Sequence, residues 1–436
     1  MTSPLRLPKL VVETREIAAV DDLLSYADAD SPLAWLRRGE GIVGIGQVGG
    51  FETGGAGDAV PGGALPGASQ PSPADWWRAT CADAEIDDPV GLHGTGLVAF
   101  GALVFDRRSA ASSRLIIPQA VIGRRGGRTW LTRIRSSVGS LTDPPAQPVP
   151  YGPYWSATLG PGALDPEGYQ AAVRAGLDAI AAGEVGKVVL ARDLVGTVPA
   201  GSDLRRLVRA LSTGYLDTWT FAVDGLIGAS PETLVTVSGG EVTARVLAGT
   251  FPRGADADDD AAASFRLSHS GKDLDEHQYA VQSVLDALAP HVSSVRADDE
   301  PFALELPNLW HLATDVAGEI ADHASALDLV AALHPTAAVA GTPTDAALEV
   351  IRRLEPFDRR RYAGPVGWVD ANGDGEWAIA LRCAQIGAEP ARRFAEYSDT
   401  IPVVAHAGAG IVAGSDPETE LLETRVKFRP IVDALA

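Results

Sequence analysis

The chain has 436 residues, of which 46% are hydrophobic, enough for a substantial core in one large domain or in two to three smaller ones. It carries 36 basic and 57 acidic residues and hence a formal net charge of −21. Such a charge argues against a surface that binds nucleic acid or an anionic membrane, because both require extensive positive charge. An anionic small molecule would need a local cluster of cations.

The N-terminal segment and the cysteines bear on the cellular compartment. Residues 1–12 lack the apolar region of a secretion signal, and no apolar run reaches the roughly 18 residues that span a bilayer. Cys81 and Cys383 are too few for a disulfide framework or a thiolate metal site. We therefore expect a cytoplasmic protein with free thiols.

The first 150 residues show few strong patterns. Residues 53–72 are rich in Gly, Ala, Pro and Ser and almost uncharged, which predicts a surface loop. Apolar runs at 96–105 and 114–116 predict strands, and residues 124–128 predict a turn. Residues 144–153 predict a linker.

Helical and strand patterns alternate from residue 165 onward. We expect helices at 166–182 and 273–288 and strands at 188–194, 219–227 and 241–246. Strand follows strand often enough to predict an α+β fold, with antiparallel sheet and helices outside.

Residues 370–375 combine Asp, Asn and Gly in the manner of a calcium loop. The twelfth position of that loop is Leu381, whereas calcium loops use a bidentate Glu there. The Asn-Gly and Asp-Gly pairs are typical of a turn between two strands. A hairpin is therefore predicted.

The C-terminal segment carries the most informative pattern. A glycine-rich loop with Gly408 and Gly410 is expected, followed by a helix that bears Glu420, Glu423 and Lys427. Offsets of three and seven residues place these three side chains on one face of the helix. Two carboxylates and an ammonium would then converge near bare main-chain amides, which suits an anionic ligand with a hard cation.

A second acidic pair, Asp273 and Glu276, lies one helical turn apart. Such pairs are usually solvated faces, so each alone says little. Together with Glu420 and Glu423 they could offer four carboxylates to one ion, and Mg²⁺ prefers oxygen ligands of this kind.

Lys187 and Glu232 are candidates for proton transfer. Lys187 starts an apolar strand, where burial could make it a base, although an exposed strand-end lysine is the commoner case. Glu232 follows another strand, where partial burial could keep its carboxyl protonated, although it could equally be a polar loop residue.

Further residues could contact an anion or a hydroxyl group. Arg382 follows a strand, and its guanidinium could bind a carboxylate through two hydrogen bonds. The others are Thr250, His311 and Tyr362, of which His311 and Tyr362 are singly more often structural residues.

Eight segments in one order resemble the chorismate-utilising enzymes, the family of isochorismate, salicylate, anthranilate and aminodeoxychorismate synthases. The resemblance covers residues 165–436 and is carried by KVVLAR, SPE, LAGT, KDLDEH, LHPTAAVAGTP, EPFDRRRYAGPVGW, ALRCA and GAGIVAGSDPETELLET. It implies one domain over 1–436, built from two large antiparallel sheets packed face to face with helices outside. Residues 165–436 would form the catalytic core, and residues 1–150, which match only loosely, would complete the sheets.

The resemblance also implies roles for individual residues. Lys187 is similar to the base that activates water, and Glu232 to the acid that protonates the departing hydroxyl. Glu276 and Glu420 are similar to direct Mg²⁺ ligands, with Asp273 and Glu423 behind them. The implied substrate-binding residues are Tyr362 and Arg382 at the enolpyruvyl carboxylate, Gly408, Gly410 and Lys427 at the ring carboxylate, and His311 and Thr250 along the ring.

Within the family, residues 333–343 and 355–368 are most similar to the isochorismate synthase branch, although that branch usually has Pro where Ala337 stands. Ala338 stands where ammonia-using members place Thr, so this site is expected to admit water as the nucleophile. The expected activity is Mg²⁺-dependent conversion of chorismate to isochorismate.

Salicylate synthase is the nearest alternative, and a non-catalytic metal-binding module is the alternative from another class. No glutamine amidotransferase subunit is expected, and a monomer is the default expectation. Whether the product serves menaquinone or siderophore synthesis stays open.

Overall fold

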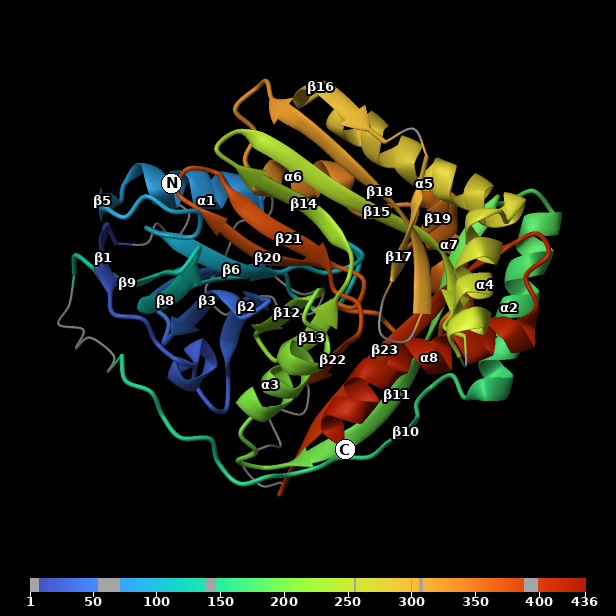
Figure 1. Cartoon of the computed structure of the whole chain (residues 1–436), viewed down its shortest axis with the longest axis horizontal. Helices are drawn as coiled ribbons and strands as arrows, with labels where there is room; N and C mark the ends of the chain where they lie inside the picture. The colour runs from blue at the N-terminus through green and yellow to red at the C-terminus, as the bar shows by residue number, and fades with distance from the viewer. Residues whose placement is uncertain are drawn as a thin grey trace, which may run out of the picture.

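The computed structural model describes residues 8–53, 71–138, 146–254, 256–298, 300–305, 309–387 and 399–436, without the side chains of Thr250, Pro252, Lys272 and Glu276. Two large β-sheets pack against each other in this part of the chain, and helices lie outside them (Figure 1). Apart from β1 and β5, which pair in parallel, the described strand pairs are antiparallel. The expected α+β fold is confirmed.

The first sheet is 13-stranded among the described residues, and its longest ladder joins β11 to β23. In spatial order its strands are β10 (Leu159–Pro161), β11 (Lys187–Pro199), β23 (Thr400–Val412), β22 (Cys383–Ile386), β13 (Leu226–Ser230), β12 (Trp219–Val223), β2 (Leu33–Arg37), β3 (Glu40–Ile45), β8 (Ala120–Arg125), β9 (Arg128–Ser136), β1 (Leu10–Ile17) and β5 (Glu85–Asp87), with β19 (Gly341–Thr342) paired to β11.

The second sheet is 10-stranded among the described residues. Its order is β16 (Val292–Ala297), β18 (Leu309–Ile320), β15 (Glu241–Pro252), β14 (Thr233–Ser238), β21 (Gly375–Ile379), β20 (Pro365–Asp370), β6 (Val98–Ala102), β7 (Arg114–Ile117) and β4 (Gly49–Glu52), with β17 (Phe302–Glu305) paired to β18.

Helices cover both sheets. α2, α3 and α8 pack on the first sheet, and α5 and α6 pack on the second. No helix among the described residues is long and apolar enough to cross a bilayer. The helices are a short 3-10 helix η1 (Leu23–Tyr26), α1 (Pro73–Ala82), α2 (Pro166–Ala181), α3 (Arg205–Gly214), α4 (Ala257–Ser268), α5 (Gly271–Leu288), α6 (Ala326–Leu333), α7 (Thr344–Leu354) and α8 (Pro417–Leu435).

Strands from the N-terminal part extend both sheets. In the first sheet Phe221 of β12 pairs with Trp35 of β2, and in the second Gly367 of β20 pairs with Gly101 of β6. The sheets also meet directly, because the buried Trp35 donates its indole N–H to Glu376 Oε2 of β21 at 2.9 Å. The single domain over 1–436 stays a prediction, which this shared pairing supports.

Several expected elements are confirmed with changed bounds. The helices expected at 166–182 and 273–288 are α2 and α5, and the strand expected at 241–246 is the longer β15. The single strand expected at 219–227 is wrong: β12 and β13 form a hairpin there, turned by two residues with positive φ, Asp224 at 51° and Gly225 at 76°. Most of the expected loop at 53–72 lies outside the described residues.

The predicted hairpin at 370–375 is confirmed, since it joins β20 to β21. One oxygen of Asp370, Oδ1, accepts main-chain hydrogen bonds from Asn372 at 2.8 Å and from Asp374 at 3.0 Å. This carboxylate therefore organises the turn.

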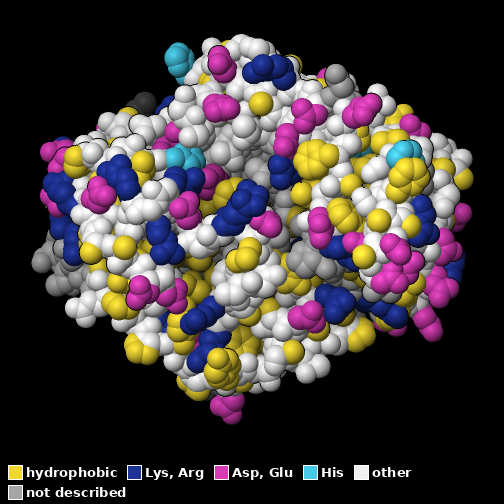
Figure 2. Space-filling model, viewed as in Figure 1, with side chains coloured by type: hydrophobic (Ala, Val, Ile, Leu, Met, Phe, Trp, Pro, Cys, Tyr) yellow, Lys and Arg dark blue, Asp and Glu magenta, His cyan; other side chains and the backbone are white. Residues whose placement is uncertain are grey.

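Charges of both signs share the surface that Figure 2 shows. Lys and Arg side chains lie there singly or in small groups among Asp and Glu, and acidic side chains gather over α4 on the right. The first turn of α4 contains Asp258, Asp259 and Asp260. No single basic area dominates this visible face.

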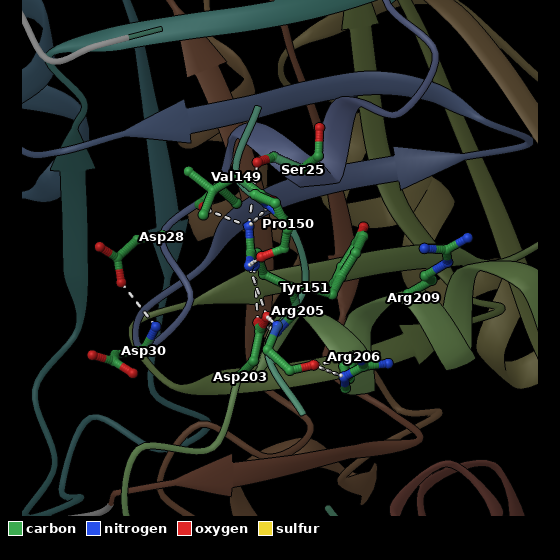
Figure 3. Close-up of polar contacts among 12 residues, drawn as sticks. Ser25, Asp28, Asp30, Val149, Pro150, Tyr151, Asp203, Arg205, Arg206 and Arg209 are labelled. Atoms are coloured by element: carbon green, nitrogen blue, oxygen red, sulfur yellow. Dashed lines mark hydrogen bonds and ion pairs between the residues drawn. The ribbon is translucent and has the colours of Figure 1, made fainter. Parts of the chain in front are cut away.

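The predicted linker is tied to the fold by Arg205, which starts α3 (Figure 3). Its buried guanidinium donates to both oxygens of Asp203, at 2.9 and 2.7 Å. It also donates to the carbonyl oxygens of Val149 at 3.1 Å and Pro150 at 3.0 Å in the linker, and to that of Ser25 in η1 at 3.2 Å. One side chain thus joins three segments that are distant in sequence.

We predict that Arg205→Ala lowers the free energy of unfolding by about 3–5 kcal/mol, because it leaves the carboxylate of Asp203 buried without its cation. Arg209→Ala is the control: its side chain is 57% exposed and lies 3.9 Å from Asp22, so a loss below about 1 kcal/mol is expected. Denaturant unfolding of the two variants measures the difference. Equal small losses would contradict the structural role of Arg205.

Candidate active site

A cavity of about 270 Å³ is lined by residues of both sheets and of α5 and α8. It brings together twelve of the fourteen predicted site residues. They are Lys187, Glu232, Asp273, His311, Ala338, Tyr362, Arg382, Gly408, Gly410, Glu420, Glu423 and Lys427. The side chains of the other two, Thr250 and Glu276, are not described.

The helical face predicted at the C-terminus is confirmed on α8. Asp416 caps the helix by accepting a hydrogen bond from the main-chain N–H of Thr419 at 2.9 Å. One face of this helix carries Glu420, Glu423 and Lys427, and all three line the cavity. Lys427 Nζ lies 2.5 Å from Glu423 Oε1, and Glu420 is buried.

The glycine-rich loop expected around Gly408 and Gly410 is wrong, because these residues belong to strand β23. Gly408 pairs with Ala191 and Gly410 pairs with Val189 of β11. A Cβ on Gly408 would lie 2.8 Å from the carbonyl oxygen of Leu190, so glycine permits this close approach. The carbonyl of Gly408 accepts a hydrogen bond from Lys427 at 2.9 Å.

Lys187 and Glu232 are both buried in the cavity wall, not exposed at strand ends. Lys187 is the first residue of β11 and pairs with Val412 of β23. Glu232 follows β13, and its main chain is fixed by bonds to Ser230 Oγ and from the N–H of Ile379. Burial raises the pKa of the Glu232 carboxyl to about 7, against the opposing charges of Lys187, Lys427 and Arg382.

Arg382 and Tyr362 both line the cavity and are close enough for each to shift the pKa of the other. Arg382 stands in the turn between β21 and β22 and has a φ of 50°, a conformation that a non-glycine residue rarely adopts. Burial lowers the pKa of Arg382 to about 10, and Tyr362, Glu423, Tyr215 and Glu232 oppose that shift. Its guanidinium therefore remains a cation at neutral pH.

His311 lies on β18 opposite the position of Thr250 on β15. Its Nδ1 lies 3.2 Å from the carbonyl oxygen of Gly249, which has a φ of 81° and sits where the ladder shifts register. Burial, then the charges of Arg382 and Lys427, holds the pKa of His311 well below its usual range. The imidazole is therefore neutral and donates from Nδ1.

The carboxylates proposed to bind a metal come from two helices. Asp273 of α5 lines the cavity, as do Glu420 and Glu423 of α8. Among the side chains that the structure describes, no group of three or more His, Cys, Asp or Glu is placed to hold a metal ion. Because the side chain of Glu276 is not among them, the four-carboxylate site stays a prediction.

Sequence patterns did not predict two titratable residues of the cavity, Arg359 and His406. Arg359 lies within a run of three arginines, and its guanidinium is buried against Glu355, with bonds of 2.8 and 2.5 Å. His406 lies on β23, two residues before Gly408. Strand alternation would have placed its side chain in the cavity had this segment been recognised as a strand.

Residues 154–436 match the family model described as chorismate binding enzyme. The chain is 37% identical over 347 residues to isochorismate synthase DhbC of Bacillus subtilis (strain 168), covering 77% of this chain and 80% of the relative. It is 39% identical over 356 residues to putative isochorismate synthase MenF of Mycobacterium tuberculosis (strain ATCC 25618 / H37Rv), covering 78% and 87%.

A crystal structure of putative 2,3-dihydroxybenzoate-specific isochorismate synthase DhbC from Bacillus anthracis superposes with a TM-score of 0.73 at 31% identity, covering 95% of this chain and 98% of that one. The family match, the two relatives and this superposition agree with the resemblance that the sequence motifs indicated. The chain belongs to the chorismate binding enzyme family.

Proposed function

We propose that this protein is an isochorismate synthase, which converts chorismate to isochorismate by adding water at C2 and releasing the C4 hydroxyl. One observation carries the proposal: a single cavity holds a carboxyl group with a pKa of about 7, a buried lysine, further cations and a set of carboxylates. The two relatives described above are named for the same activity, the second of them as putative.

Substrate binding requires neutralisation of two carboxylates. Arg382, with Tyr362 beside it, is assigned to the enolpyruvyl carboxylate, since its planar guanidinium suits a carboxylate. Lys427 and the main chain at Gly408 and Gly410 are assigned to the ring carboxylate. A dianion can thus bind inside a protein whose net charge is −21.

Lys187 is assigned as the base and Glu232 as the acid. Lys187 accepts a proton from the water that attacks C2, and Glu232 donates a proton to the C4 hydroxyl, which leaves as water while the ring double bonds shift. At the end of the reaction Lys187 carries a proton and Glu232 is ionised, and the net reaction is an isomerisation. A carboxyl group with a pKa of about 7 suits this role, because it holds its proton at neutral pH and still donates it.

Mg²⁺ is assigned to the carboxylates of Glu420 and Glu276, with Asp273 and Glu423 behind them. These oxygen donors fit the ion, and Asp273, Glu420 and Glu423 line one cavity. When bound, Mg²⁺ would neutralise the ring carboxylate of the substrate.

Ala338 bears on the choice of nucleophile. Its methyl group lines the cavity and offers no hydrogen bond with which to orient ammonia. We therefore assign water as the nucleophile, with salicylate synthase as the alternative if the product goes on to lose pyruvate. The proposal includes action in the cytoplasm without an amidotransferase subunit, with the product used for menaquinone or siderophore synthesis.

The first expected outcome is that purified protein with Mg²⁺ converts chorismate to isochorismate and also catalyses the reverse reaction. Chromatography from both directions, with pyruvate followed by lactate dehydrogenase, measures the products. Little pyruvate should appear. Stoichiometric pyruvate with salicylate would indicate the salicylate synthase alternative, and anthranilate or aminodeoxychorismate formed with ammonium would rule out water as the nucleophile.

Removal of either proton-transfer group should lower turnover. Lys187→Ala and Glu232→Gln are each expected to reduce kcat about 100-fold or more, with smaller effects on chorismate binding. In the wild type, kcat/KM should fall as the pH rises through about 7, because Glu232 must be protonated to act as the acid. A near-normal kcat in Lys187→Ala, or an unchanged alkaline limb in Glu232→Gln, would contradict the assignment.

The metal assignment predicts that EDTA abolishes turnover and that Glu420→Ala loses Mg²⁺ binding while it remains folded. Titration calorimetry with Mg²⁺ alone measures binding independently of activity. Glu418→Ala is the matched control, because Glu418 lies on the exposed side of the same helix. Equal Mg²⁺ affinity in Glu420→Ala and the wild type would exclude Glu420 as a ligand.

A further inference from the structure

His406 lines the active-site cavity, and none of the assignments above uses it. It pairs with Asp193 across the ladder between β23 and β11. Side chains alternate along a strand, so His406, Gly408 and Gly410 share one face of β23. Only 8% of His406 is exposed, so its ring is almost enclosed by the cavity wall.

Two aromatic rings fix the orientation of the imidazole. His406 stacks on Tyr362, with ring centroids 5.1 Å apart and an interplanar angle of 22°. Phe357 packs on it at the same centroid distance, with an angle of 48°. The imidazole therefore lies beside Tyr362, on which the charge of Arg382 also acts, and all three residues line the cavity.

His406 is neutral at physiological pH. Burial lowers its pKa to about 4, Arg359 and Arg360 act in the same direction, and Asp193 and Asp358 oppose them. A neutral imidazole has one N–H donor and one acceptor nitrogen. Within the described part of the chain, neither ring nitrogen has a hydrogen-bond partner.

An aromatic hydrocarbon ring would stack on Tyr362 as well as an imidazole does, so stacking alone gives no reason for a histidine. A polar ring edge buried in a ligand cavity gains from a ligand partner, because an unpaired buried polar group is costly. Arg382 already supplies positive charge near Tyr362, and a neutral N–H adds a directed hydrogen bond without burying a second cation.

We propose that His406 is a substrate-binding residue that donates a hydrogen bond from its imidazole N–H to the enolpyruvyl carboxylate of chorismate, beside Arg382 and Tyr362. This inference rests on the proposed function, because it names the ligand of that same site. Three groups then hold one carboxylate: a cation, a phenol and an imidazole.

The test compares His406→Phe, which keeps an aromatic ring but removes the N–H, with His406→Gln, which keeps an N–H donor but removes the ring. Titration calorimetry with chorismate and no metal gives Kd, and steady-state assays with Mg²⁺ give KM and kcat. His406→Phe should weaken Kd and raise KM about tenfold or more, the scale of a hydrogen bond to a charged group, with kcat within about threefold of the wild type. His406→Gln should stay within about threefold of the wild-type Kd.

His291→Phe serves as the control, because His291 pairs with Asp322 outside the cavity, and its Kd should be unchanged. Should His406→Phe fail to fold, His406→Leu replaces it with the same expected loss of affinity.

Wild-type affinity in His406→Phe, or an equal loss in His406→Gln, would overturn the role of the imidazole N–H while leaving the proposed function intact. A wild type that neither binds nor converts chorismate would overturn both.

Discussion

Strand β11 is the constraint on which the active site depends. All of its 13 residues pair with β23 on one side. On the other side, among the residues that the structure describes, it pairs only with β19 at its start and with β10 near its middle. Between those two strands a buried ion pair completes the edge: Glu355 Oε1 accepts the main-chain N–H of Ala191 at 2.8 Å, and Arg359 donates to the carbonyl oxygen of Val189 at 2.7 Å. The ion pair thus replaces a missing strand, since these buried main-chain groups would otherwise lack partners. The position of Lys187 at the start of β11 depends on the same edge.

Burial of charge explains how a cavity that is lined by several basic side chains can still contain a protonated acid. The positive charges of Lys427 and Arg382, and that of Lys187 when it carries a proton, favour the ionised form of Glu232, yet its pKa lies near 7. Loss of hydration therefore outweighs all three attractions by about 3 kcal/mol, since each pKa unit corresponds to about 1.4 kcal/mol. In the proposed reaction, Lys427 and Arg382 would thus attract the substrate carboxylates without removing the proton that Glu232 must donate.

Local periodicity predicted the part of the site that lies on one helix. Glu420, Glu423 and Lys427 reach one cavity because a helix repeats every 3.6 residues wherever it packs. The segment around Gly408 was wrongly predicted to be a loop, because glycine and alanine have low strand propensity. That propensity is a weak guide where two strands approach closely. The pairing with β11 was decisive there, and it joins segments more than 200 residues apart in sequence.

Residues whose role depends on tertiary contacts could not be predicted from local pattern. Three consecutive arginines have different environments: Arg359 is buried on Glu355, Arg361 bonds Asp224, and Arg360 adopts a positive φ of 53°. No local pattern distinguishes them, because each partner comes from the fold. His406 differs, since side-chain alternation two residues before Gly408 would have placed it in the cavity. Side chains alternate in this way only along a strand. Because the segment around Gly408 was predicted to be a loop, His406 was not predicted to line the cavity.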